Sequence, residues 1–162
     1  MIVRVDDLRP EGLRVDLTLE VGALSYEDCF EIQVGAVKFT AHVSPSRRGL
    51  TCTGRIEAVI SVPCSRCLAY YALPLDRQFD VPYLQAPPAG EAERADFQIS
   101  REDLDVSYLD AEGKLDMRDL ASEQIYLALP MKPLCAVECR GLCSGCGSNL
   151  NIETCRCAAT AG

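Results

Sequence analysis

The feature that most restricts the fold of this sequence is a strict alternation of apolar and polar residues over most of the first 84 positions. In residues 13–21 every odd position is apolar, which gives a strand one apolar and one polar face. The same alternation returns in three further segments, at residues 30–34, 37–43 and 50–62. Gly35 and Ala36 break its phase, as a β-bulge or a tight hairpin does. The pattern predicts antiparallel strands with one buried face, arranged as a small barrel or sandwich.

The chain after this alternating part has a different pattern. Residues 68–83 predict one more strand, with an edge or a kink at Pro74, and residues 85–96 are typical of a linker or loop. A helix is predicted between Asp116, a plausible N-cap, and Pro130. Its apolar positions recur at helical spacing: Met117, Leu120, Ala121, Ile125 and Ala128. We expect this helix to cover the sheet or its open end.

The expected fold class is therefore α+β, with three successive units. An antiparallel β domain occupies residues 1–84, and an acidic loop with the covering helix occupies residues 85–130. Residues 131–162 contain too few apolar side chains to form a core, so another interaction must hold this unit together.

Cysteine supplies such an interaction, because the chain has ten cysteines and its first residues show no signal-peptide pattern. We therefore expect a reducing, cytoplasmic environment, in which clustered cysteines are metal ligands rather than disulfides. Cys143 and Cys146 are two residues apart and precede Gly147, a spacing that lets a tight turn present both thiolates to one ion. Cys155 and Cys157 can complete a tetrahedral Cys₄ zinc site.

A second zinc site is predicted from two more pairs. Cys64 and Cys67 have the same spacing, and Cys135 and Cys139 would lie on one side of a helical turn. Their union would attach the C-terminal unit to the sheet. Two alternatives remain open: a single zinc on four of the six C-terminal cysteines, or a redox pair at Cys64 and Cys67.

No catalytic constellation emerges from the sequence. His42 is the single histidine and alternates out of an apolar row, so we expect a surface residue. Cys29 and Cys52 are expected in the core. We find no Ser/His/Asp set, paired-carboxylate site or phosphate-binding loop, and no apolar stretch long enough to span a membrane. The expectation is a protein that is not an enzyme.

The negative charge is concentrated in one part of the chain. The net charge is −8, and residues 85–123 hold 11 Asp and Glu against 4 Lys and Arg. These acidic residues either belong to a solvated loop and the polar side of a helix, or they form a surface that binds a basic partner. The candidate partner-binding residues are Glu91, Glu93, Asp96, Glu102 and Asp103. Arg66, Arg140 and Arg156 beside the cysteines would either offset thiolate charge or contact phosphate locally.

Three segments, residues 62–68, 123–130 and 133–151, together resemble the YceD family of bacterial and plastid proteins, which are described as large ribosomal RNA subunit accumulation proteins. The resemblance covers essentially the whole chain. It implies a role in accumulation, processing or assembly of the large-subunit RNA, without a mechanism.

Together these observations predict a non-enzymatic factor in ribosome biogenesis that carries zinc. Because two Cys₄ zinc sites would add further negative charge, we expect direct RNA binding to be weak and the partner to be a basic ribosomal protein or a precursor particle. The rival class is a thiol redox or RNA-processing enzyme that uses Cys64 and Cys67.

Overall fold

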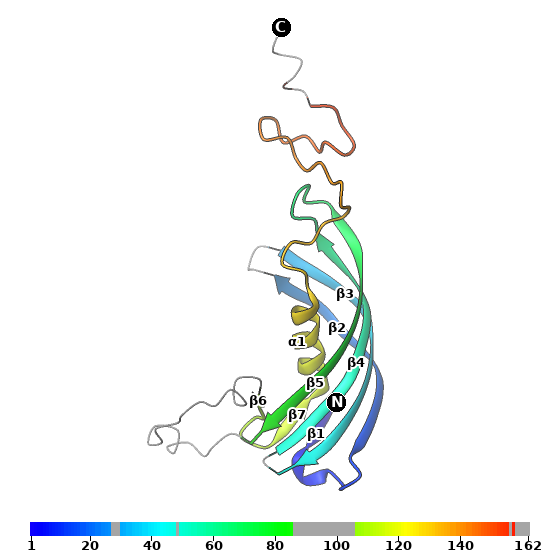
Figure 1. The fold of residues 1–162 in the computed structure, drawn as a ribbon, viewed down its shortest axis with the longest axis vertical. Helices are drawn as coiled ribbons and strands as arrows, with labels where there is room; N and C mark the ends of the chain where they lie inside the picture. Colours follow the sequence, from blue (N-terminus) through cyan, green and yellow to red (C-terminus); the bar gives the residue numbers. More distant parts are fainter. Residues whose placement is uncertain (27–29, 48, 86–105, 156, 158–162) are drawn as a thin grey trace, which may run out of the picture.

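A computed structural model describes residues 1–26, 30–47, 49–85, 106–155 and 157. The alternating segments form four long antiparallel strands: β2 (Leu13–Tyr26), β3 (Phe30–Ser46), β4 (Gly49–Pro63) and β5 (Tyr70–Leu84). They lie side by side in a long, curved sheet (Figure 1). The short strand β6 (Ser107–Tyr108) pairs in parallel with the end of β5. The register between β3 and β4 shifts between Val34 and Lys38, as the phase break at Gly35 and Ala36 predicts.

The sheet of five strands, in the order β2-β3-β4-β5-β6, is open. The expected antiparallel sheet is present, but neither the barrel nor the sandwich is confirmed. A separate two-stranded ribbon joins β1 (Ile2–Arg4), which leads into a 3₁₀ turn at Val5–Asp7, to β7 (Lys114–Asp116). Strands of three residues carry too short a pattern to be predicted from sequence.

Helix α1 (Met117–Ala128) lies on the concave side of the sheet (Figure 1). Its N-cap is Asp116, whose carboxylate accepts a hydrogen bond from the Arg118 backbone N–H at 2.8 Å, as the sequence predicts. Tyr126 donates its hydroxyl proton to the Ser25 carbonyl of β2, and Arg77 of β5 donates to the carbonyl of the next residue, Leu127. These bonds fix the C-terminal end of α1 to two strands, β2 and β5, that lie on opposite sides of β3 and β4.

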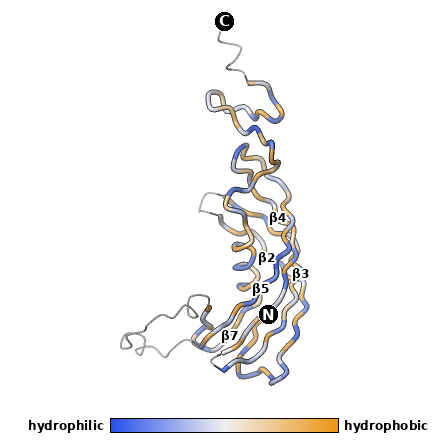
Figure 2. Tube along the Cα trace, viewed as in Figure 1, coloured by the Kyte–Doolittle hydropathy of each residue, from blue (hydrophilic) through white to orange (hydrophobic). Residues whose placement is uncertain are grey.

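The core fills the space between α1 and the concave face. Apolar residues alternate with polar ones along the strands (Figure 2), and the inward rows include Phe39, Ile56 and Cys52, all fully buried. Phe39 stacks on Phe79, with ring centroids 5.6 Å apart. Gly54 lies in the same layer, where a Cβ atom would approach the Thr40 carbonyl oxygen at 2.3 Å. The close approach of the neighbouring strand therefore requires glycine at this position.

Candidate metal centres

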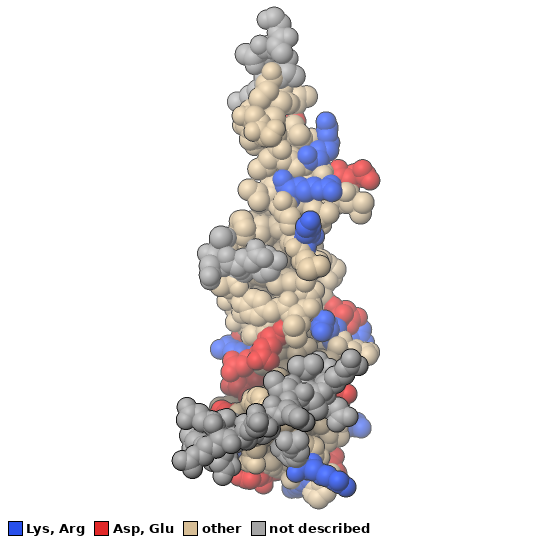
Figure 3. Space-filling view, turned by 60° about the vertical axis from the view of Figure 1, so that its left-hand side comes forward, with Lys and Arg blue, Asp and Glu red and all other residues tan. Residues whose placement is uncertain are grey.

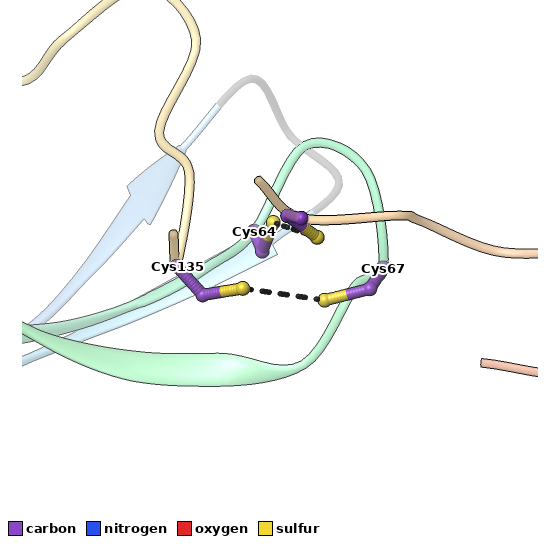
Figure 4. A group of neighbouring side chains, drawn as sticks. Cys64, Cys67 and Cys135 are labelled. Carbon is purple, nitrogen blue, oxygen red and sulfur yellow. Dashed lines mark hydrogen bonds between the residues drawn. The ribbon is translucent and has the colours of Figure 1, made fainter. Parts of the chain in front are cut away.

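The first cysteine cluster joins segments that are far apart in the sequence. Cys64 and Cys67 lie in the turn between β4 and β5, and Cys135 and Cys139 follow α1. The turn and the C-terminal segment face each other so that the sulfurs point inward (Figure 4). The Cys64 and Cys139 sulfurs are 3.7 Å apart, as are those of Cys67 and Cys135, and all four sulfurs lie within 4.8 Å of one another.

Backbone hydrogen bonds build this turn around its sulfur atoms. The Leu68 N–H donates to the Cys64 carbonyl at 2.9 Å, which closes the turn, and the Arg66 N–H points at the Cys64 sulfur at 3.4 Å. The Ser65 N–H donates to the Pro133 carbonyl at 2.8 Å and so fastens the turn to the C-terminal segment. The segment around Cys135 and Cys139 is an irregular turn, so the expected helical turn there is wrong.

The second cluster is local and more exposed. Cys143, Cys146, Cys155 and Cys157 place their sulfurs within 4.8 Å of one another, and the Cys143 and Cys155 sulfurs are 3.1 Å apart. Cys146 and Cys157 are exposed, whereas three of the four cysteines of the first cluster are buried. The Gly147 N–H donates to the Cys143 carbonyl at 2.9 Å. The two clusters therefore use the same turn.

One residue distinguishes the two turns. Gly147 follows the second cysteine of its pair with φ +73°, a conformation that glycine adopts readily. Leu68 occupies the matching position of the first turn with φ +59° and is the one non-glycine residue with positive φ among those described. Its side chain is 50% exposed. The turn thus imposes a left-handed conformation that costs leucine about 1–2 kcal/mol.

The electrostatics of the first cluster favour a bound cation. Burial raises the pKa of the Cys64 thiol, but the backbone N–H groups of Cys135, Cys67 and Arg66 outweigh it and lower this pKa to about 6. The neighbouring sulfur of Cys139, followed by burial, raises the pKa of Cys135 to about 12. Some of the sulfurs therefore ionise readily while their neighbours resist, because adjacent thiolates repel each other. A divalent cation would remove that conflict.

Zinc fits this donor set. Four sulfurs at about 2.3 Å from a tetrahedral zinc ion would lie about 3.8 Å from each other. The two 3.7 Å distances in the first cluster, and the 3.9 Å between Cys146 and Cys155 in the second, are close to this value, whereas the 3.1 Å between Cys143 and Cys155 is shorter. Four thiolates with backbone N–H donors around them are typical of structural zinc sites.

Two residues hold the segments around the cysteines together, and the sequence indicates this role for neither of them. Asn151, expected only as a turn residue, donates its side-chain amide to the Cys139 sulfur at 3.4 Å and accepts from the Arg140 N–H at 2.8 Å. Arg66 donates its guanidinium to the carbonyls of Val137 and Cys139 at 3.3 and 2.9 Å. Arg66 is thus occupied in holding the C-terminal segment, whereas Arg156 lies outside the described residues.

The remaining sequence candidates fall elsewhere. Cys52 is buried beneath the sheet, and burial followed by the nearby Asp80 raises its pKa to about 12, so this thiol is inert. His42 lies on the outer face, with Nε2 at 3.2 Å from the Glu11 carbonyl oxygen. Cys29 and the five acidic candidates (Glu91, Glu93, Asp96, Glu102 and Asp103) lie outside the described residues.

A groove of about 440 Å³ is lined by other residues of the acidic stretch. We call it the acidic groove; it lies where α1 begins, beside the ends of β5 and β6, and its polar lining includes Asp110, Asp116, Asp119, Glu123, Tyr83 and Tyr108. Figure 3 shows acidic side chains gathered in the half of the molecule far from the C-terminus, and basic ones prominent near the cysteine clusters. Among the described helices, none is long and apolar enough to cross a membrane.

The chain is similar in sequence to one protein family and to one curated protein. The family model described as large ribosomal RNA subunit accumulation protein YceD matches residues 52–162. Uncharacterized protein ML1660 of Mycobacterium leprae (strain TN) is 25% identical over 104 residues, which cover 62% of this chain and 42% of that protein. The chain thus spans less than half of that relative's length, and no solved structure matches significantly. Since the matched residues contain α1 and both cysteine clusters, the chain belongs to the YceD family.

Proposed function

We propose that the chain is a non-enzymatic, cytoplasmic factor in large-subunit rRNA accumulation that binds a ribosomal protein or a precursor particle. The observation that carries this proposal is the family match over residues 52–162, because the family is described by its effect on the large-subunit RNA. In this proposal zinc is held by Cys64, Cys67, Cys135 and Cys139 in one site and by Cys143, Cys146, Cys155 and Cys157 in the other. Its role there is to hold the C-terminal segment in shape.

The geometry of the first cluster favours a structural role over thiol chemistry. Cys64 is fully buried and Cys67 is 5% exposed, and both sulfurs face the other two cysteines of the cluster. A redox pair needs one accessible sulfur that a substrate thiol can attack. A zinc-dependent nuclease, in turn, needs an open coordination position, which four cysteine ligands do not leave.

The acidic stretch between residues 85 and 123 supports a basic partner. Its net charge of −7 follows from the 11 acidic and 4 basic residues of that stretch, while the rest of the chain is almost neutral. Such a surface attracts basic ribosomal proteins and repels RNA phosphate.

The test is copurification of ribosomal proteins or precursor particles with the tagged chain over a series of salt concentrations. We expect specific large-subunit components to copurify and to be released as salt rises, because exposed charges are screened beyond about 8 Å at physiological ionic strength. Neutralising Glu91, Glu93, Asp96, Glu102 and Asp103 together should reduce recovery without changing the zinc content. Retained partners in that variant, with tight binding of purified large-subunit RNA that Arg140 and Arg156 substitutions abolish, would replace this proposal with direct RNA recognition.

A further inference from the structure

The carboxylates of the acidic groove differ in how they are used by the fold. Asp110 accepts hydrogen bonds from the backbone N–H groups of Glu112 and Lys114 at 2.9 and 2.8 Å, which shapes the turn before β7. Asp116 caps α1 and lies 3.7 Å from the amino group of Met1. These two carboxylates therefore have structural partners.

Asp119 and Glu123 have no such partner. Neither carboxylate makes a hydrogen bond or an ion pair with any residue that the structure describes. They are four positions apart on α1, where two like charges repel each other and destabilise a helix. Lys114, the basic residue in the lining, pairs instead with Glu112. Within the described residues, these two carboxylates thus lie side by side in the groove without a neutralising partner.

A second, independent observation comes from Tyr83, which lines the same groove. Its side chain is buried, with 4% of the residue exposed, and its hydroxyl makes no hydrogen bond within the described part of the chain. The hydroxyl carries no burial penalty of its own, since Arg77 Nε is the one side-chain nitrogen or oxygen atom that is both buried and without a partner in the described part of the chain; a mostly buried tyrosine nevertheless usually bonds through this group. A ligand that donates a hydrogen bond here would satisfy the phenol and the two carboxylates together.

We propose that the acidic groove binds an arginine side chain of a basic protein partner, which rests on the proposed function for the identity of that partner. A guanidinium carries its charge on a planar fork of five N–H donors, which suits two carboxylates and a phenol oxygen. Tyr108, which is 59% exposed at the rim, offers a ring face on which a guanidinium stacks. Asp119, Glu123 and Tyr83 are the residues that bind the cation.

The experiment titrates the zinc-loaded full chain with a hexa-arginine peptide and measures affinity by calorimetry at low salt. Asp119→Asn with Glu123→Gln should weaken binding about tenfold, since each partly exposed ion pair contributes up to about 1 kcal/mol. The matched control is Asp16→Asn with Asp80→Asn, which removes two charges from exposed positions on the outer face of the sheet. We expect this control to bind the peptide with an affinity within about twofold of the parent chain. Salt screens the effect of charges that lie far from the groove, so only a small effect remains.

Tyr83→Phe tests the hydroxyl by itself. We expect about threefold weaker peptide binding with a free energy of unfolding within about 0.5 kcal/mol of the parent, because this hydroxyl has no hydrogen-bond partner within the described part of the chain. A loss of binding without a loss of stability distinguishes a binding role from a structural one.

Equal losses in the groove variant and in the control, or no peptide binding at all, would overturn the inference. The proposed function has a separate test, so the two fail in different ways. If the peptide does not bind but ribosomal components still copurify, the groove inference alone is wrong. If the peptide binds at the groove and no ribosomal component copurifies, the cation site stands and the proposed function is wrong.

Discussion

The matching turns of the two cysteine clusters allow the cost of a left-handed residue to be measured. We predict that Gly147→Ala weakens zinc binding at the second cluster by about fivefold. The left-handed conformation costs a residue with a Cβ about 1–2 kcal/mol, and the lower entropy of the unfolded chain returns about 0.4–1 kcal/mol. The net cost of about 1 kcal/mol corresponds to that factor. No steric term is added, because a Cβ at Gly147 would meet no atom within 4 Å.

The assay is competition for zinc with a chromophoric chelator, with native mass spectrometry to assign the ion that is lost. Strain should appear in zinc affinity because this segment has few apolar contacts, so that metal binding and local folding are coupled. Gly147→Asn is the control, since asparagine tolerates the left-handed region better, and it should lose less affinity than the alanine variant. Leu68→Gly relieves strain but loses the contacts of a half-buried side chain, and should remain within about 1 kcal/mol of the parent. Equal losses for alanine and asparagine, or a loss beyond about a hundredfold, would refute the strain argument.

Three further predictions concern the metal, the sheet and pH. Native mass spectrometry of the chain purified without chelator should show two zinc ions, and the Cys146→Ser variant should show one. This variant should also become sensitive to protease at residues 141–157 while the sheet stays folded, and unfolding of the entire chain would contradict separate sites. Gly54→Ala should lower the free energy of unfolding by about 3 kcal/mol in urea titrations with zinc content unchanged, because the new Cβ would approach the Thr40 carbonyl oxygen at 2.3 Å and Phe79 at 2.7 Å; a change below about 0.5 kcal/mol would show that the strands separate easily. Burial, followed by the charge of Asp119, raises the pKa of Glu123. The native state therefore holds this proton more tightly than the unfolded chain does, and it loses stability as pH rises through that pKa. Glu123→Gln should be more stable than the parent by about 0.3 kcal/mol at pH 7 and should show no gain below about pH 4, which thermal melts at both pH values would reveal.

The sequence predicted the elements whose residues carry a long periodic pattern. The odd-numbered apolar row of β2 and the break at Gly35 are local properties, and the strands and the bulge follow from them. Whether the sheet closes depends instead on whether its two edge strands meet, which alternation does not encode. The expectation of a barrel or sandwich went beyond the pattern for this reason.

The candidate site shows the same division. Spacing alone predicted the two sets of four cysteines that the fold brings together, because two residues between thiolates already suit one ion. The amide of Asn151 at the Cys139 sulfur was not predictable, since asparagine is also a common turn residue. Asp119 and Glu123 resemble the polar face of any surface helix until the groove and the buried Tyr83 are seen beside them.

The span of the first cluster has a consequence for synthesis of the chain. Cys64 and Cys139 are 75 residues apart, whereas Cys143 and Cys155 are separated by 12. At about 5–20 residues per second, Cys67 is made roughly 3 to 14 s before Cys135. During that interval the nascent chain carries two of the four thiols without the others, while the second cluster is completed within a few seconds of its first cysteine. Closing the first cluster is therefore a late event that depends on the segment after α1 having been translated and brought back to the sheet.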